Sequence, residues 1–181
     1  VLVIILSVCT TVLSIMYAYS RPQVVAYKIS MGQNFLPFRI AVIADLHLRK
    51  YTSEVITTQA VNVVMSMQPD LILLLGDTID APQKVMQNLP VLTKLEELQA
   101  PLGIYAVTGN NDLQWNLTRE TGHKFYRKYH IRLLEDEQVI LPNGVTLIGR
   151  DDKTKKPRRK DLKYWSHHER GEKLMIYLDH Q

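Results

Sequence analysis

Cysteine is nearly absent from this chain of 181 residues, in which Cys9 is the single example. One cysteine excludes an internal disulfide framework and a zinc site built from thiolates. Any metal ion must therefore be held by oxygen and nitrogen ligands. Internal repeats and glycine-serine linkers are also missing. Hydrophobic residues make up 46% of the chain and charged residues 22%, which allows one buried core and excludes a disordered chain.

Charge is missing from the first 19 residues, Val1–Tyr19. An apolar helix of about 20 residues is needed to cross a bilayer core of roughly 30 Å, and Tyr17 and Tyr19 fall where an aromatic belt would lie. We therefore predict a transmembrane helix at residues 1–20 and a linker at 21–37, which would place the protein at a membrane and leaves open the side on which the rest of the chain lies. The alternatives are a signal-peptide core and a buried soluble helix.

Both ends of the chain are abrupt. It begins at Val1 and stops at Gln181, straight after the apolar run 174–178. We expect a fragment that is open at both ends, so that residues needed for function can lie outside it.

Positive charge is unevenly distributed. The formal net charge is +4, and much of the excess lies in Lys153–Lys160 (KTKKPRRK). This basic run could attract an anionic substrate or an anionic lipid surface, or it could be a solvated loop. Because no aromatic residues interleave with it, we expect no nucleic acid partner.

Apolar runs alternate with helical patterns along the middle of the chain. The predicted buried strands lie at 40–44, 71–75 and 104–107, and the predicted helices lie at 53–67 and 83–98, with Pro90 at a break in the second. This order is typical of βαβ units in an α/β fold, and the first strand should be buried on both faces. Shorter strands at 131–134, 139–141 and 145–149, with a turn at 142–144, indicate an antiparallel part, and a last strand lies at 174–178.

Polar residues follow the strands. Asp45 and His47 come after the first strand, Asp77 after the second, Asn110 after the third and His180 after the last. Ligand-binding groups in α/β sheets lie just past the carboxyl ends of the strands. Carboxylate, imidazole and amide oxygen suit a pair of divalent transition ions, and Asp77 is the natural bridging carboxylate.

Three motifs resemble those of the calcineurin-like metallophosphoesterases. They are Asp-x-His at 45–47, Gly-Asp-x-x-Asp at 76–80 and Gly-Asn-x-Asp at 109–112. Within that family the chain is most similar to the membrane-associated bacterial branch, through Gly-Arg-Asp-Asp at 149–152 and Asp-His-Gln at 179–181. The resemblance implies a metallophosphoesterase-type β-sandwich of mixed sheets flanked by helices at residues 38–181, truncated at its C-terminus.

The resemblance also implies a set of site residues. Asp45, His47 and Asp77 would hold one divalent ion, and Asp77, Asn110 and His180 would hold the other. The two ions would be Mn²⁺, Fe²⁺ or Zn²⁺. The following positions, Asn111 and Asp112, are the candidate catalytic residues.

Two departures from the family pattern qualify this prediction. Asn111 stands where the family usually has a histidine that helps the leaving group depart, and an amide cannot donate a proton. A general acid typically contributes roughly 10²- to 10⁴-fold. The family's late Gly-His-x-His element would lie beyond Gln181.

The predicted function is hydrolysis of a phosphomonoester, phosphodiester or pyrophosphate by a hydroxide that two metal ions activate. The partner would be a phosphorylated small molecule or a lipid-linked phosphate, and no protein partner is indicated. A nucleotide phosphodiesterase is one alternative. A catalytically impaired metal-binding protein that acts as a scaffold at a membrane is the other, and Asn111 favours it.

Overall fold

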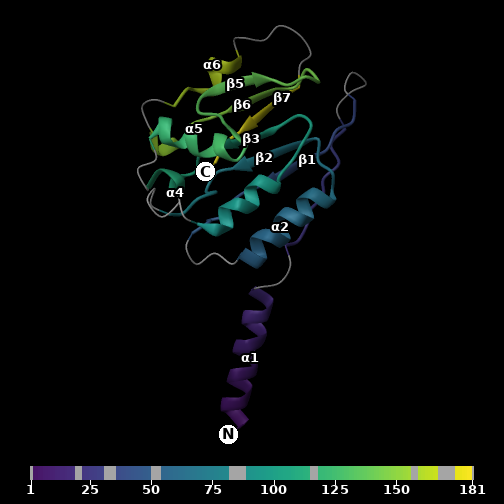
Figure 1. The fold of residues 1–181 in the computed structure, drawn as a ribbon, viewed down its shortest axis with the longest axis vertical. Coiled ribbons are helices and arrows are strands. Elements are labelled where there is room, and N and C mark those ends of the chain that lie inside the picture. Colours follow the sequence, from purple (N-terminus) through teal and green to yellow (C-terminus); the bar gives the residue numbers. More distant parts are fainter. Residues whose placement is uncertain are drawn as a thin grey trace.

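The computed structural model describes most of the chain, namely residues 2–18, 22–30, 36–49, 54–81, 89–114, 118–155, 159–166 and 174–180. Two stacked sheets and their helices form the body of the molecule, and helix α1 (Leu2–Ala18) extends away from it (Figure 1). The α/β sandwich of mixed sheets flanked by helices is therefore confirmed.

The first sheet is entirely parallel and has the order β1-β2-β3-β4. Its strands are β1 (Ile40–Ile43), β2 (Leu71–Leu75), β3 (Ile104–Val107) and β4 (Arg132–Leu133). The predicted strands at 40–44, 71–75 and 104–107 are confirmed. The expectation that the chain turns antiparallel from residue 131 is wrong for β4, which pairs with β3 in parallel.

The second sheet has three strands in the order β5-β6-β7. They are β5 (Glu137–Ile140), β6 (Thr146–Gly149) and β7 (Met175–Leu178). Strands β5 and β6 form the predicted antiparallel hairpin, whose turn includes Gly144 with a φ of 83°. Strand β7 returns parallel to β6, and its carboxyl end leads directly to His180.

Three helices contribute to the core on the face of the first sheet that lies away from the second sheet, namely α2 (Glu54–Ser66), η1 (Pro90–Glu97) and α5 (Arg119–Lys128). The shorter helices are α4 (Asn110–Gln114), η2 (Lys153–Lys155) and α6 (Leu162–Ser166), and α6 lies beside β5 of the second sheet (Figure 1). Residues 83–88 of the predicted helix 83–98 lie outside the described residues. The described remainder is a 3₁₀ helix that Pro90 opens, in the first-turn position that proline tolerates.

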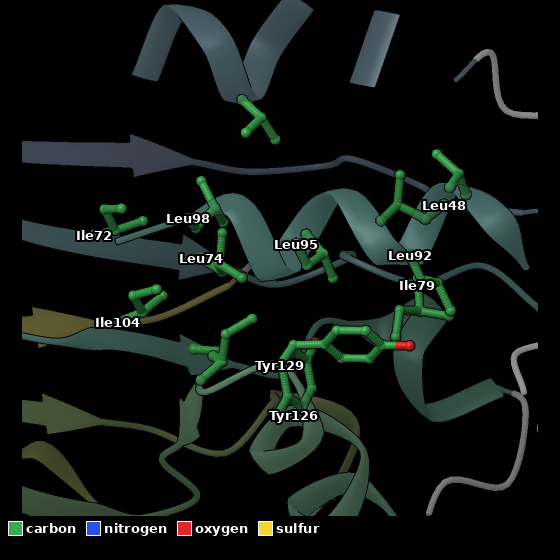
Figure 2. Packing of buried hydrophobic residues seen from close by; sticks show 14 of the residues in the cluster. Leu48, Ile72, Leu74, Ile79, Leu92, Leu95, Leu98, Ile104, Tyr126 and Tyr129 are labelled. Atoms are coloured by element: carbon green, nitrogen blue, oxygen red, sulfur yellow. The ribbon is translucent and has the colours of Figure 1, made fainter. Parts of the chain in front are cut away.

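Strand β2 contributes to two cores at once. Ile72 and Leu74 lie on the side of Leu95 and Leu98, as Figure 2 shows, and belong to the core between the sheet and its helices. Leu71 and Leu73 point the other way, into the core between the two sheets. Successive side chains of a strand leave opposite faces, so a strand covered on both faces needs an unbroken apolar sequence.

The prediction that β1 is buried on both faces is wrong. Ala41 is buried against the helices, whereas Ile40 and Val42 are 38% and 56% exposed. Strand β1 lies at the edge of its sheet in the described structure. The residues that pack between the two sheets come from β2 and β3 rather than from β1, so the second face of β1 is left uncovered.

The predicted transmembrane helix at residues 1–20 is also wrong. Helix α1 contains 17 residues, Leu2–Ala18. At 1.5 Å per residue it rises about 26 Å, which is less than the roughly 30 Å of a bilayer core. No helix in the described ranges is both long enough and apolar enough to span a membrane.

Truncating Leu74 should destabilise the fold strongly. Leu74 is fully buried in the centre of the first sheet, so Leu74→Ala should lower the free energy of unfolding by about 2–5 kcal/mol. The matched control is Leu36→Ala, since Leu36 is 87% exposed, and its effect should stay within about 0.5 kcal/mol. Urea titration followed by tryptophan fluorescence measures both. Equal effects of the two substitutions would contradict this account of the core.

Candidate metal centre

The register of the strands brings the candidate residues to one edge of the sandwich. Ile43 of β1 lies beside Leu74 of β2, and Leu75 lies beside Val107 of β3. Asp45, Asp77 and His180 each come two residues after the end of their strand. The carboxyl ends of β1, β2 and β7 therefore deliver two carboxylates and an imidazole to the same region.

The loops after β1 and β2 are joined by their backbones. The His47 amide donates to the Asp77 carbonyl at 2.9 Å, and the Leu48 amide donates to the Thr78 carbonyl at 3.0 Å. Leu48 and Ile79 then form a parallel bridge, and both are fully buried. This pairing extends the sheet past its last regular residues and fixes the two loops relative to each other.

Three candidate ligands have a left-handed backbone. Their φ angles are 54° for Asp45, 45° for His47 and 48° for Asp77. Such a conformation costs a residue other than glycine of order 1–3 kcal/mol and persists only where the surroundings enforce it. Here the paired loops enforce it, and the backbone turns so that the side chains converge.

One carboxylate oxygen lies between two imidazoles. Asp77 Oδ2 is 3.7 Å from His47 Nε2 and 3.6 Å from His180 Nε2. His47 Nε2 is also 3.8 Å from Asp45 Oδ1. Ligand atoms of Asp45, His47 and Asp77 all lie within 4.8 Å of one another. Asp77 is the buried member of this group, whereas Asp45 is exposed to solvent.

These distances suit ligands of a shared cation. Two atoms that each lie about 2.1 Å from one ion at a tetrahedral angle are about 3.4 Å apart. His180 Nδ1 donates to the Leu75 carbonyl at 2.8 Å, which leaves the Nε2 lone pair directed toward Asp77. A hydrogen bond from the second ring nitrogen to a carbonyl is the usual arrangement of a metal-binding histidine. The donor set and its geometry therefore fit a divalent cation.

Glycines make room for this cluster. A Cβ atom on Gly76 would lie 2.5 Å from His180 Nδ1, and one on Gly109 would lie 2.2 Å from Asp77 Oδ1. Gly76 also has a φ of 82°. Both glycines are part of the sequence motifs, and their role is to let backbone approach the Asp77 and His180 side chains.

The two asparagines at the start of α4 differ in their placement. Asn110 is the first residue of α4, half-buried at the carboxyl end of β3. Asn111 contacts Asp77 directly, because its backbone amide donates to Oδ1 at 2.9 Å and its side-chain amide donates to Oδ2 at 2.6 Å. Asn111 thus binds both oxygens of the central carboxylate.

Asp112 faces the protein interior. It is fully buried, and its carboxylate accepts hydrogen bonds from the backbone amides of Ile79 and Gly109, both at 2.8 Å. Burial raises the pKa of Asp112 to about 6, although these two hydrogen bonds act to lower it. The neighbouring Tyr126 is also buried, and burial raises its phenol pKa well above the ordinary value. Through its hydrogen bonds to the Ile79 and Gly109 amides, Asp112 links the loops after β2 and β3.

Two residues behind the cluster were not singled out from the sequence. Asp80 Oδ2 lies 3.8 Å from His47 Nδ1 and 3.4 Å from Arg49 Nη1. Asp179 Oδ2 accepts from Arg150 at 2.6 Å and from Arg159 at 2.5 Å. Their positions in the sequence could have identified them, because Asp80 is the last residue of the Gly-Asp-x-x-Asp motif and Asp179 directly precedes His180.

The basic run is more than a solvated loop in its described part. Arg159 is nearly buried against Asp179. Lys160 donates from Nζ to the Asp136 carbonyl at 3.0 Å and lies over the rings of Tyr164 and Trp165. Arg159 is thus tied to the residue that precedes His180, whereas Lys160 is tied to Asp136 and to α6.

Comparison with known proteins identifies relatives of this arrangement. Residues 38–171 match the calcineurin-like phosphoesterase superfamily domain. A metallophosphoesterase of Aquifex aeolicus is 34% identical over 110 residues, which are 60% of this chain and 40% of that protein.

Two further relatives carry more specific names. The UDP-2,3-diacylglucosamine pyrophosphatase LpxG of Chlamydia muridarum is 34% identical over 45% of this chain and 25% of its own length. A zebrafish (Danio rerio) protein, named a transmembrane protein with metallophosphoesterase domain, is 23% identical over 84% of this chain and 36% of its own length. The chain thus spans less than half the length of each of these three relatives.

Filling the space at Gly109 should weaken metal binding. Gly109→Ala would push Asp77 Oδ1 out of place, so the affinity for Mn²⁺ should fall by roughly 10- to 100-fold, as for other disrupted outer contacts of metal ligands. Isothermal titration calorimetry measures the change. The control is Gly122→Ala, because a Cβ there meets only Leu133 Cδ2 at 3.3 Å, and its affinity should equal that of the unaltered chain. An unchanged affinity in Gly109→Ala would show that Asp77 does not bind the ion.

Proposed function

The chain belongs to the calcineurin-like phosphoesterase superfamily, and from this premise we propose that it is a metal-dependent hydrolase of phosphate ester or anhydride bonds. The observation that carries the proposal is the position of Asp77 Oδ2 between His47 Nε2 and His180 Nε2. A buried carboxylate oxygen between two imidazoles is suited to bridge two cations. We take residues 38–181 as the hydrolase domain.

The proposed ligands divide into two groups that share Asp77. Asp45 and His47 approach it from the loop after β1, and His180 approaches from the end of β7. Asn110, at the start of α4, is the proposed amide ligand of the second group. Two divalent cations would lower the pKa of a water molecule and withdraw charge from the phosphoryl oxygens. The metal, whether Mn²⁺, Fe²⁺ or Zn²⁺, is not distinguished by this donor set.

Residues around the ligands hold them in position. Asp80 faces the Nδ1 atom of His47, and the Leu75 carbonyl holds the Nδ1 atom of His180. Asp112 fixes the loops after β2 and β3 through its two backbone contacts, so we propose a positioning role for it rather than contact with substrate.

The proposed substrate is a phosphorylated small molecule or a lipid-linked phosphate. Support comes from the Chlamydia muridarum relative, whose name describes a pyrophosphatase that acts on a diacylated sugar nucleotide. The similarity covers 45% of this chain and includes no measure of substrate choice.

A second candidate function is that of a metal-binding protein without catalytic activity. Asn111 favours it, because the side chain that follows the proposed ligand Asn110 is an amide that binds Asp77 and cannot deliver a proton. Such a protein would still bind cations and phosphorylated ligands.

Removing the charge of Asp77 should abolish the proposed activity. The full chain is assayed with Mn²⁺ and bis-p-nitrophenyl phosphate, and Asp77→Asn should lose at least about 100-fold in kcat/KM together with metal binding. Asp161→Asn is the control, since Asp161 is exposed beside α6, and it should keep full activity. Hydrolysis by Asp77→Asn at the normal rate would refute the proposed site. Metal binding without any hydrolysis by the unaltered chain would favour the second candidate function.

A further inference from the structure

We propose that this site selects substrates by their leaving group, so that it cleaves phosphoanhydrides and aryl phosphate esters but hardly cleaves alkyl phosphate esters. The inference rests on the proposed function and adds the substrate class to it. It follows from the absence, among the described residues of the site, of a side chain placed to give a proton to the leaving oxygen.

The chemistry of hydrolysis makes that proton important. A bond forms from a water oxygen to phosphorus, and the bond from phosphorus to the leaving oxygen breaks, with the electron pair going to the leaving oxygen. The water loses a proton to solvent, and the leaving oxygen either gains a proton or departs as an anion. Where no acid is positioned at the leaving oxygen, that proton must come from water, whose pKa is about 15.7. The rate then depends on how stable the departing anion is.

The two imidazoles at the site are already engaged. His47 directs Nε2 toward Asp45 and Asp77 and Nδ1 toward Asp80. His180 donates from Nδ1 to the Leu75 carbonyl and directs Nε2 toward Asp77. Both rings are therefore committed to the proposed metal centre and its support.

Asn111 also contacts Asp77. Its backbone and side-chain amides donate to the two Asp77 oxygens at 2.9 and 2.6 Å. An amide N–H can donate a hydrogen bond but does not give up its proton at neutral pH. Asn111 acts here as a positioning residue that holds the Asp77 carboxylate.

The other acidic groups described near the site are engaged within the protein. Asp112 and Tyr126 are fully buried, and the Asp112 carboxylate accepts from the Ile79 and Gly109 amides. His123 lies on α5 with Nε2 3.2 Å from Glu135 Oε2. Burial keeps Asp112 and Tyr126 from a leaving oxygen in solvent, and the ring of His123 faces Glu135.

Leaving groups differ widely in the stability of their anions. A departing phosphate has a pKa of about 6, and a phenol has a pKa of about 10, whereas an alcohol is a far weaker acid. A general acid is worth roughly 10²- to 10⁴-fold where the leaving group needs it, and little where it does not. Substrates with an acidic leaving group are therefore those that this site can cleave at a useful rate.

A series of aryl methyl phosphates tests the inference. The esters run from p-nitrophenyl, through less acidic phenols, to phenyl, and an alkyl diester is added. Each is hydrolysed by the full chain saturated with Mn²⁺, and log kcat/KM is plotted against the pKa of the leaving group. The unaltered chain should show a steep fall. Asn111→His adds an imidazole with a pKa of about 6.5 at this position, so its plot should be shallower.

Two controls separate proton donation from other effects. Asn111→Ala removes the side-chain contact with Asp77, keeps the backbone contact and adds no acid, so its plot should remain steep even if its Mn²⁺ affinity, measured by calorimetry, falls. Asn62→His adds an imidazole on the exposed side of α2 and should not change the plot. The gain of Asn111→His over the unaltered chain should grow from near onefold for p-nitrophenyl to about 100-fold or more for phenyl.

The outcomes distinguish the leaving-group inference from the proposed hydrolase function. A shallow plot for the unaltered chain would overturn the leaving-group inference, and so would parallel plots for the unaltered chain and Asn111→His. Either result would leave the proposed hydrolase function unaffected. Failure of every form to cleave any ester while binding Mn²⁺ would overturn the proposed function, and the inference with it.

Discussion

Burying the Asp77 carboxylate is the constraint around which the site is built. A buried charge is unfavourable unless its oxygens are satisfied, and here Asn111 donates to both of them while His47 and His180 approach one. Asp77 reaches this place with a left-handed backbone, and backbone hydrogen bonds from the loop after β1 hold its loop. The absence of a Cβ atom at Gly109 leaves room for its carboxylate. The neighbouring features of the site serve to keep one carboxylate in one place.

Much of this could be predicted from the sequence, because it depends on patterns along the chain. Apolar runs predicted the strands, and the polar residues just past these runs predicted that Asp45, Asp77 and His180 lie near one another, as they do in the structure. The orientation of Asn111 could not be predicted, because it depends on how α4 meets the loop after β2. The sequence also could not tell which faces are covered, so the exposure of Val42 was missed.

The first helix is a feature that the sequence predicted wrongly. An uncharged run of 19 residues predicted a membrane span, whereas the helix that the structure describes, Leu2–Ala18, has 17 residues. The zebrafish relative, which is named as a transmembrane protein, is 23% identical to this chain, against 34% for the Chlamydia muridarum relative.

Strand β2 supplies Leu71 and Leu73 to one core, Ile72 and Leu74 to the other, and Asp77 to the site. A shift of β2 by one residue would exchange its two faces and would also move Asp77 by more than 3 Å along the sheet. Misaligned forms of the protein would therefore lose the candidate metal centre together with their packing. If the proposed ions bind there, metal retention would report on correct strand alignment and could serve as a measure of native folding in preparations of this chain.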